Sequence, residues 1–262
     1  MFAEERQQLI AGLVSSRGRV TVQELAERFT ITQETVRRDL GALEESRTLR
    51  RVHGGAVSLD KLSMSESSLS ERSTQHLPQK QRIAARAAKL IPATRSASII
   101  LDAGTTTELL AEQLGGWAPQ SAGDELLVIT NAIPIAFKLS ANSALQLQML
   151  GGRVRGLTSA AVGPQTTDQL TALRPDIAFI GANGVHAEFG LSTPDPLEAA
   201  VKAAIVRSAR RVVVLADSSK LGQETLVRFA GLEQLDMVIT DAAPDEQLSA
   251  ALATADVELV IV

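Results

Sequence analysis

Glycine- and threonine-rich segments follow several short apolar runs of the chain, and their residue types suit the binding of a small anion. The clearest is Asp102-Ala-Gly-Thr-Thr-Thr107, where Gly104 would permit close approach of a ligand. The free amides and hydroxyls of Thr105 and Thr106 could then hold a phosphate. A plain helix cap is the alternative for this turn. The segment fits neither a Gly-Lys-Ser/Thr phosphate loop nor a Gly-x-Gly-x-x-Gly fingerprint, so we expect no cofactor such as ATP or NAD.

Polar residues after other apolar runs, and on one later segment, would complete such a site. They supply backbone amides, an amide side chain, carboxylates and cations, which suit a phosphate and sugar hydroxyls. Besides Asp102, Gly104, Thr105 and Thr106, the candidate ligand-binding residues are Thr130, Asn131, Gly151, Gly152, Arg153, Gly181, Asn183, Gly184, Glu198, Lys202, Asp217 and Lys220. Each has a plainer explanation as a tight turn, a helix cap or a surface ion pair. Their joint placement favours a common crevice.

The same side chains leave a catalytic function open. Asp102, Glu198 and Lys202 could serve as acid–base groups of a sugar-phosphate isomerase. The chain has no cysteine, and its three histidines (His53, His76 and His186) are far apart in sequence. We therefore expect neither a thiol nucleophile nor a bound metal.

The elements that must position these residues are predicted strands alternating with helices. Short apolar runs occupy residues 98–102, 126–130, 145–150, 177–180, 212–216, 237–240 and 257–262. Helix-like segments such as 106–114 and 196–208 lie between them, so the pattern predicts a mostly parallel sheet covered by helices. In open parallel sheets the ligand binds beyond the carboxyl ends of the strands, where the candidate residues stand.

The first part of the chain predicts three short helices. The first contains Leu9–Val14 and stops at Gly18. Thr21 and Glu24 form a capping box that starts a second helix over 22–29. Thr32 can cap a third helix.

Two further patterns complete a predicted winged helix-turn-helix. The third helix would bury Val36, Leu40 and Leu43, which are spaced at i, i+4 and i+7. After it, residues 48–57 change from helical spacing to alternation around Gly54-Gly55, which predicts a small hairpin or wing.

The exposed side of the third helix and the wing are the candidate DNA contacts. A recognition helix places its N-terminal side chains at base edges while arginines bind the backbone. The predicted DNA-binding residues are Thr32, Gln33, Glu34, Thr35, Arg37, Arg38, Arg51 and His53. The alternative is that Arg37 and Arg38 only pair with Glu34 or Glu44 on a solvated helix face.

Composition and charge support two domains. The net charge is -4, but residues 1–58 hold nine arginines against eight acidic residues. Residues 59–77 are serine-rich and are predicted to be a linker between a DNA-binding domain over 1–58 and an α/β domain over 78–262. No run is long enough for a membrane span and the first residues are too polar for a signal peptide, so we expect a cytoplasmic protein without a membrane partner.

Together these motifs resemble the DeoR family of bacterial regulators from about Glu4 to Asp241. The motifs of the predicted DNA-binding domain over 1–58, called the head below, are Leu25-Ala26, Thr35-Val-Arg-Arg-Asp-Leu40, Leu43-Glu44 and Arg51-Val-His-Gly-Gly-Ala56. The motifs of the second half are Glu71-Arg72, Lys80, Ile83-Ala84, Asp102-Ala-Gly-Thr-Thr106, Thr130-Asn131, Gly151-Gly152, Gly181-Ala-Asn-Gly184, Gly190-Leu-Ser-Thr193 and Asp217-Ser-Ser-Lys220. One departure is Ser46-Arg-Thr48, where the family more often has a glycine, which puts the angle of the wing in doubt.

The resemblance implies a sensor domain similar in fold to ribose-phosphate isomerases, with a sugar-phosphate pocket and no enzymatic task. It implies a repressor of genes for sugar uptake or catabolism that binds double-stranded operator DNA as a homodimer or homotetramer. A phosphorylated sugar, such as fructose 1-phosphate or fructose 6-phosphate, would release it. A constitutive DNA-binding protein whose pocket has decayed is the remaining alternative.

Overall fold

The computed structural model describes residues 3–17, 19–46, 48–52, 54–58, 68–92 and 96–262. The chain divides into two compact units, Met1–Glu66 and Ser67–Val262. Of the predicted linker over 59–77, residues 59–67 lie outside the described residues, while 68–77 belong to the second unit. There α4 (Leu69–Thr74) and the start of α5 (Leu77–Ala88) take the place of a linker.

The N-terminal unit has the predicted three helices and hairpin. It consists of α1 (Ala3–Arg17), β1 (Arg19–Thr21), α2 (Val22–Phe29), α3 (Gln33–Glu45), β2 (Leu49–Val52) and β3 (Gly55–Ser58). The capping box that starts α2 is confirmed, since the Glu24 amide donates to Thr21 Oγ1 over 3.1 Å and the Thr21 amide donates to Glu24 Oε2 over 2.8 Å. The predicted inward face of α3 is buried at Val36, Leu40 and Leu43.

Strand β1 was not predicted, and it makes the hairpin part of a three-stranded antiparallel sheet in the order β1-β3-β2. Gly55 permits this pairing, because a Cβ added there would lie 2.0 Å from the Val20 carbonyl oxygen. The second glycine of the Gly-Gly pair is therefore required by a close approach of two strands.

A buried ion pair ties α1 to α3. Arg6 Nε donates to Asp39 Oδ2 over 2.6 Å and Arg6 Nη2 donates to Asp39 Oδ1 over 3.1 Å. The Asp39 side chain is 3% exposed and that of Arg6 is 11% exposed. Asp39 thus points inward from a helix whose preceding residues, Arg37 and Arg38, are exposed.

Asp39→Asn is expected to destabilise the N-terminal unit by about 3 kcal/mol, because removing one charge of a buried pair leaves the other uncompensated. Hydrogen exchange of the α1 and α3 amides, measured in the whole chain, should then lose about a hundredfold of its protection. Glu45→Gln makes the same charge change at the exposed end of α3 and should leave protection unchanged. Equal protection in Asp39→Asn and wild type would show that the pair contributes little.

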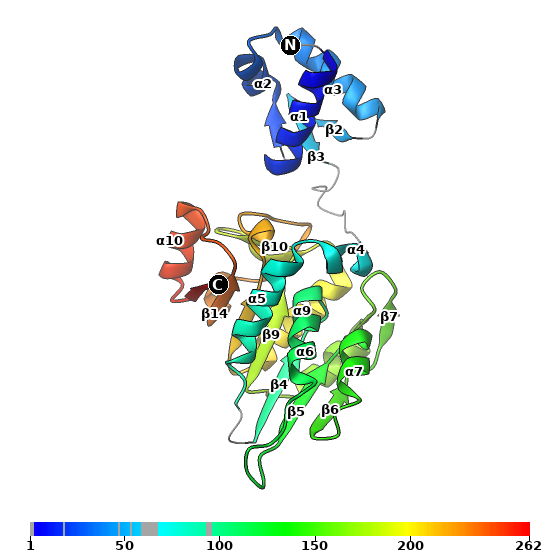
Figure 1. Cartoon of the computed structure of the whole chain (residues 1–262), viewed down its shortest axis with the longest axis vertical. Helices are drawn as coiled ribbons and strands as arrows, with labels where there is room; N and C mark the ends of the chain where they lie inside the picture. Colours follow the sequence, from blue (N-terminus) through cyan, green and yellow to red (C-terminus); the bar gives the residue numbers. More distant parts are fainter. Residues whose placement is uncertain (1–2, 18, 47, 53, 59–67, 93–95) are drawn as a thin grey trace. The chain divides into compact units, whose positions relative to one another are not determined.

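The C-terminal unit is built on a seven-stranded sheet in the order β15-β14-β12-β9-β4-β5-β6, in which every pair of neighbours is parallel. Its strands are β4 (Ala97–Leu101), β5 (Leu126–Thr130), β6 (Leu145–Met149), β9 (Ile177–Gly181), β12 (Val212–Leu215), β14 (Met237–Thr240) and β15 (Glu258–Ile261). All seven correspond to the predicted apolar runs, so the parallel α/β fold is confirmed. Figure 1 shows β9, β4, β5 and β6 side by side.

Helices cover both faces of this sheet. Alternate residues of each strand separate into two cores, as Ile99 and Leu101 of β4 belong to one and Ile100 to the other. The helices α5, α6 (Thr105–Leu114) and α7 (Ile133–Leu139) bury one face, while α8 (Pro164–Thr171), α9 (Pro196–Ser208) and α10 (Glu246–Thr254) bury the other. The inner strands of the sheet are covered on both faces and are apolar almost throughout, which explains why they stood out in the sequence, whereas the edge strands β6 and β15 are partly exposed.

The strand order reverses between β4 and β9. From β4 the chain adds β5 and β6 on one side, and from β9 it adds β12, β14 and β15 on the other. The segments leaving the carboxyl ends of β4 and β9 therefore diverge, which opens a crevice between them. Among the described residues, no helix is long and apolar enough to cross a membrane.

Smaller antiparallel pairs were not predicted. They are β7 (Arg153–Arg155) with β8 (Ala160–Val162), and a three-stranded sheet of β10 (Gly184–His186), β11 (Gly190–Thr193) and β13 (Val227–Ala230). Two short 3-10 helices, η2 (Ser218–Lys220) and η3 (Leu232–Gln234), complete the unit.

Candidate functional site

A polar pocket lies at the carboxyl ends of β4, β9 and β12, where the strand order reverses. Segments that leave these strands form its walls together with α9 and the region from α4 to α5. Its lining residues are Arg72, Gln75, His76, Lys80, Ala103, Gly104, Thr105, Thr106, Thr107, Gly181, Ala182, Asn183, Glu198, Lys202, Leu215, Ala216, Asp217 and Lys220.

The N-terminus of α6 forms one wall. Its N-cap is Gly104, which offers no side chain to the first amides of the helix. Thr107 does not replace a cap, because its hydroxyl donates to the carbonyl oxygens of Asp102 and Gly104 over 2.6 and 2.8 Å. The backbone amides of the first turn and the Thr105 and Thr106 hydroxyls at the pocket wall thus form a potential anion site.

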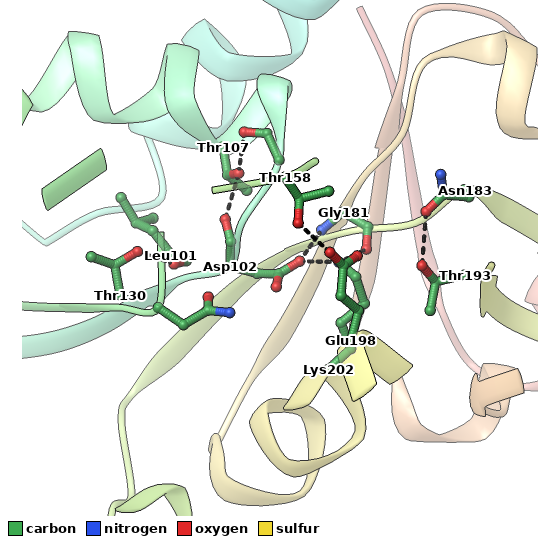
Figure 2. A network of polar contacts seen from close by, with 12 residues as sticks. Leu101, Asp102, Thr107, Thr130, Thr158, Gly181, Asn183, Thr193, Glu198 and Lys202 are labelled. Carbon is green, nitrogen blue, oxygen red and sulfur yellow. Dashed lines mark hydrogen bonds and ion pairs between the residues drawn. The ribbon is translucent and has the colours of Figure 1, made fainter. Parts of the chain in front are cut away.

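A buried ion pair forms the floor. Lys202 Nζ donates to Asp102 Oδ2 and to the carbonyl oxygen of Gly181, the latter over 2.9 Å, and the Gly181 amide donates to Asp102 Oδ2 over 3.2 Å (Figure 2). The Lys202 ammonium also lies 5.7 Å from the ring centre of Phe229. Burial raises the pKa of Asp102 above its ordinary value, although the ammonium of Lys202 opposes this. The pair connects the middle of α9 to the carboxyl ends of β4 and β9.

Glu198, one turn before Lys202 on α9, links the pocket to the β7–β8 hairpin. Its Oε1 accepts hydrogen bonds from Arg155 Nη1, over 3.1 Å, and from the Thr158 hydroxyl. Arg155 Nε also donates to Asp195 Oδ2 over 3.1 Å. Figure 2 shows Thr158 directed at Glu198, and on the other side Thr193 donating to Asn183 Oδ1 over 3.0 Å.

Three cations and one acid form the remaining wall. Lys80 is 4% exposed and donates to the Arg72 carbonyl oxygen over 2.6 Å. The pKa of Lys80 is lowered to about 8, chiefly by burial; the charge of Asp217 opposes this shift, and the charges of Lys220 and Arg72 add to it. Asp217 is also the N-cap of η2, which carries Lys220. An anion bound here would be stabilised by more positive than negative charge.

Ten of the sixteen candidate ligand-binding residues come together at this pocket. Asp102 lies beneath it, bonded to Lys202, and the others line it: Gly104, Thr105, Thr106, Gly181, Asn183, Glu198, Lys202, Asp217 and Lys220.

The other six lie outside the lining. Five of them lie at or just after the carboxyl ends of β5 and β6, which are separated by β4 from the reversal of strand order, and the sixth, Gly184, begins β10. The Thr130 hydroxyl donates to the Leu101 carbonyl oxygen over 2.7 Å, and Asn131 Nδ2 donates to the Ala161 carbonyl oxygen over 3.1 Å. Gly152 and Gly184 permit close packing of the chain. A Cβ at Gly152 would lie 2.1 Å from Thr166 Oγ1, and one at Gly184 would lie 2.4 Å from the Gln223 carbonyl oxygen. The outward-facing residues of the group are Gly151 and Arg153, which are exposed.

Arg72, Gln75, His76 and Lys80 were missed as pocket residues because the serine-rich composition before them predicted a linker. Two signals were present. Ser68 and Glu71 have capping-box spacing, and the structure forms that box at the start of α4. Lys80 shares the buried face of α5 with Ile83, Ala84 and Ala87, and a lysine on such a face requires a polar partner.

The candidate DNA-binding residues of α3 lie on its exposed side. The Thr32 hydroxyl caps the helix by accepting the Thr35 amide over 3.2 Å, so its role is at least structural. Arg37 lies 3.4 Å from Glu34 Oε2 and 3.5 Å from Gln33 Oε1. The predicted alternative of a solvated ion pair therefore fits Arg37.

Arg38 and Arg51 are placed differently. Arg38 is exposed, and its side chain has no hydrogen bond or ion pair with any residue that the structure describes. In β2 the Arg51 amide donates to Glu44 Oε1 over 2.9 Å, and Arg51 Nη1 lies 3.8 Å from the position of a Cβ on Gly41. The wing arginine thus lies beside α3, and Glu44 is bonded to the wing. His53 lies outside the described residues.

Metal binding finds no support in the described ranges, where no group of three His, Asp or Glu side chains could hold an ion. The structure therefore offers hydrogen bonds and charges for a ligand and an exposed arginine-bearing helix for DNA.

Comparisons with known proteins match both units. The DeoR-like helix-turn-helix domain matches residues 6–62 and the DeoR C terminal sensor domain matches residues 75–242. The chain is 35% identical to the uncharacterized HTH-type transcriptional regulator FruR of Bacillus subtilis, over 92% of each chain. It is 34% identical to the lactose phosphotransferase system repressor of Streptococcus mutans, over 95% of this chain and 96% of that one.

A solved structure of ribose 5-phosphate isomerase A from Methanocaldococcus jannaschii is similar over 54% of this chain and 53% of that chain, with 21% identity and a TM-score of 0.38. The chain thus spans about half the length of that isomerase. The relatives that match along nearly the whole chain are named as transcriptional regulators or repressors. Since both domains match in order and the relatives cover almost the full length, this chain belongs to the DeoR family of transcriptional regulators.

Proposed function

We propose that the protein represses genes of sugar uptake or catabolism and is released from its operator by a phosphorylated sugar bound in the pocket. The observation that carries this proposal is the division of the pocket into a cationic side and a side of hydrogen-bonding groups. Its relative in Streptococcus mutans is named for repression of a lactose phosphotransferase system.

The cationic side fits a phosphate. The open amides at the start of α6, with Thr105 and Thr106, would donate to phosphate oxygens, and Lys80 and Lys220 would add charge-assisted hydrogen bonds. These donors come from three separate elements (α5, α6 and η2), so they surround the anion. A single helix cap would not gather them.

The remaining lining fits sugar hydroxyls. Asn183, Glu198 and Asp217 offer amide and carboxylate groups that accept hydrogen bonds from hydroxyls. Glu198 is held by Arg155 and Thr158, so its orientation is fixed before a ligand binds. This side would choose among phosphorylated sugars.

DNA binding is assigned to α3 and the wing, with a homodimer or homotetramer reading paired half-sites. The test is a mobility shift on the protein's own promoter DNA with fructose 1-phosphate, fructose 6-phosphate and unphosphorylated fructose. We expect the protein to bind this DNA. A phosphorylated sugar should release the protein from the DNA, and unphosphorylated fructose should not. Lys220→Ala should retain DNA binding and respond to sugar phosphate only weakly. DNA binding unaffected by any sugar phosphate would favour a constitutive protein with a decayed pocket, and no binding to promoter DNA would refute the repressor.

The affinity for the phosphorylated sugar is expected to fall about tenfold between pH 7 and pH 9, because Lys80, with a pKa of about 8, loses its charge in this interval. The phosphate stays dianionic throughout, since its second pKa is about 6. Calorimetry at constant ionic strength measures the dependence. Lys80→Met should bind weakly with little variation over the same interval. A wild-type affinity that is constant from pH 7 to pH 9 would show that Lys80 does not contact the phosphate.

A further inference from the structure

The helix α4 is the first element of the C-terminal unit, and residues 59–67 connect it to the DNA-binding unit along the chain. None of its residues is buried. Its N-terminus is closed by a capping box, in which the Ser68 amide donates to Glu71 Oε2 over 2.8 Å and the Glu71 amide donates to Ser68 Oγ over 3.3 Å. These hydrogen bonds lower the pKa of Glu71. Since α4 has only the half-buried Leu69 as an apolar contact, its position depends mainly on polar contacts with the rest of the unit.

One of these contacts comes directly from the pocket. The Lys80 ammonium donates to the carbonyl oxygen of Arg72, in the second half of α4. Lys80 and Arg72 both line the pocket, as do Gln75 and His76 immediately after the helix. A phosphate oxygen is a stronger acceptor for an ammonium than a neutral carbonyl oxygen is. A phosphate that draws the Lys80 side chain toward itself would therefore weaken the hydrogen bond of Lys80 to α4.

A second contact holds the first residue of α4. The Leu69 amide donates to the carbonyl oxygen of Leu157 over 3.2 Å. Leu157 lies in the turn between β7 and β8. Thr158 follows it directly and Arg155 is the last residue of β7, and both of these donate to Glu198 Oε1. Thr158 is 4% exposed and does not line the pocket, whereas Glu198 does. A ligand that forms a hydrogen bond with Glu198 would therefore change the contacts of the turn that holds the start of α4.

We infer that α4 is the element through which the occupied pocket changes operator binding, with Glu198 and Thr158 as positioning residues that connect the ligand to it. This inference rests on the proposed function, since it concerns how the same pocket is read out. A ligand shifts an equilibrium only through contacts that differ between two states. Lys80 and Glu198 can supply such contacts, because both line the pocket. Lys80 is bonded to α4, and Glu198 is bonded to the turn that holds α4.

Thr158→Val tests the connection, because it keeps the shape of the side chain and removes the hydroxyl that donates to Glu198. In the whole chain without ligand, hydrogen exchange of peptides covering 68–77 is expected to become about fivefold faster at the amides of α4. Thr158→Ser keeps the hydroxyl and should exchange like the wild type. The fluorescence of Trp117, the single tryptophan, reports whether both variants remain folded.

The same variants are then titrated with fructose 1-phosphate and fructose 6-phosphate. Without ligand, Thr158→Val should bind operator within about threefold of wild type. The release is compared at saturating sugar phosphate, with the concentration set for each variant by calorimetry, and the ratio of operator affinities without and with ligand should fall at least about threefold. Full release of Thr158→Val by a ligand that it binds, or unchanged exchange in 68–77, would overturn the role of α4 and leave the proposed function standing. Absence of sugar-phosphate binding to wild type in calorimetry would instead refute the proposed function.

Discussion

Lys202→Met is expected to destabilise the C-terminal unit by about 3–5 kcal/mol near neutral pH, because it leaves the Asp102 carboxylate buried without its countercharge. The Asp102 side chain is 1% exposed and the Lys202 side chain 6% exposed. In the variant only the Gly181 amide would remain as a described hydrogen-bond donor to the Asp102 carboxylate. Methionine has nearly the length of lysine and could pack against Phe229, so the lost charge dominates the effect.

The pH dependence of this loss has a definite sign. Burial already raises the pKa of Asp102, and removing Lys202 raises it further. A carboxyl group whose pKa is higher in the folded state binds its proton more tightly there, so folding gains stability as pH falls and loses it as pH rises. The difference between variant and wild type should therefore shrink from pH 8 toward pH 5.

Urea unfolding followed by Trp117 fluorescence measures both effects, since this tryptophan packs on the core between the sheet and α6. The control is the double variant Asp102→Asn with Lys202→Met, in which no buried charge remains unpaired. It should recover much of the stability and lose the pH dependence. A Lys202→Met protein as stable as wild type at every pH would show that the pair is held without electrostatic benefit.

The sheet could be predicted from sequence chiefly because its inner strands are buried on both faces. Runs such as 126–130 and 212–216 are apolar at every position or nearly so, and no exposed face interrupts them. The sequence does not contain their spatial order, which depends on crossovers between distant segments. Without the order β9-β4-β5, the ends of β5 and β6 looked equivalent to those of β4 and β9, and Asn131 and Arg153 were assigned to the pocket for that reason.

The short antiparallel strands lacked any such signal. Residues 153–155 contain two arginines around one valine. In the structure they pair with β8, and Arg155 donates to Glu198 of α9. The segment before Lys80 was similarly hidden, because α4 buries none of its residues and is held by polar contacts. Contacts of this kind join residues far apart in sequence, and local residue patterns do not record them.

The helices of the head and their N-cap residues could be predicted from sequence, because capping depends on residues close together in the chain. Thr21 with Glu24, and Thr32 with Thr35, act within one helical turn. The role of Asp39 could not be read in the same way, since its partner Arg6 lies in another helix. The motif Arg37-Arg38-Asp39 therefore combines two exposed cations with one inward carboxylate.

Arg38→Ala is expected to weaken operator binding by about 1–3 kcal/mol for each head that contacts DNA, which is the range for a bidentate arginine contact with a base. Arg37 already lies beside Glu34 and Gln33, so its replacement should cost less. Operator affinity is measured by fluorescence anisotropy at several salt concentrations. Arg207→Ala, which removes the same charge from an exposed position of α9, serves as the control.

The salt dependence separates two forms of this contact. If Arg38 reads a base, its loss lowers the preference for operator over random DNA and leaves the slope of log affinity against log salt nearly unchanged. If it binds a phosphate, binding to both DNAs weakens and the slope falls by about 0.9 for each lost contact. In either case the sugar-phosphate affinity of the isolated protein should stay at the wild-type value, because Arg38 belongs to the other structural unit. Unchanged operator affinity would remove Arg38 from the DNA-binding surface and leave the wing arginine, Arg51, as the stronger candidate.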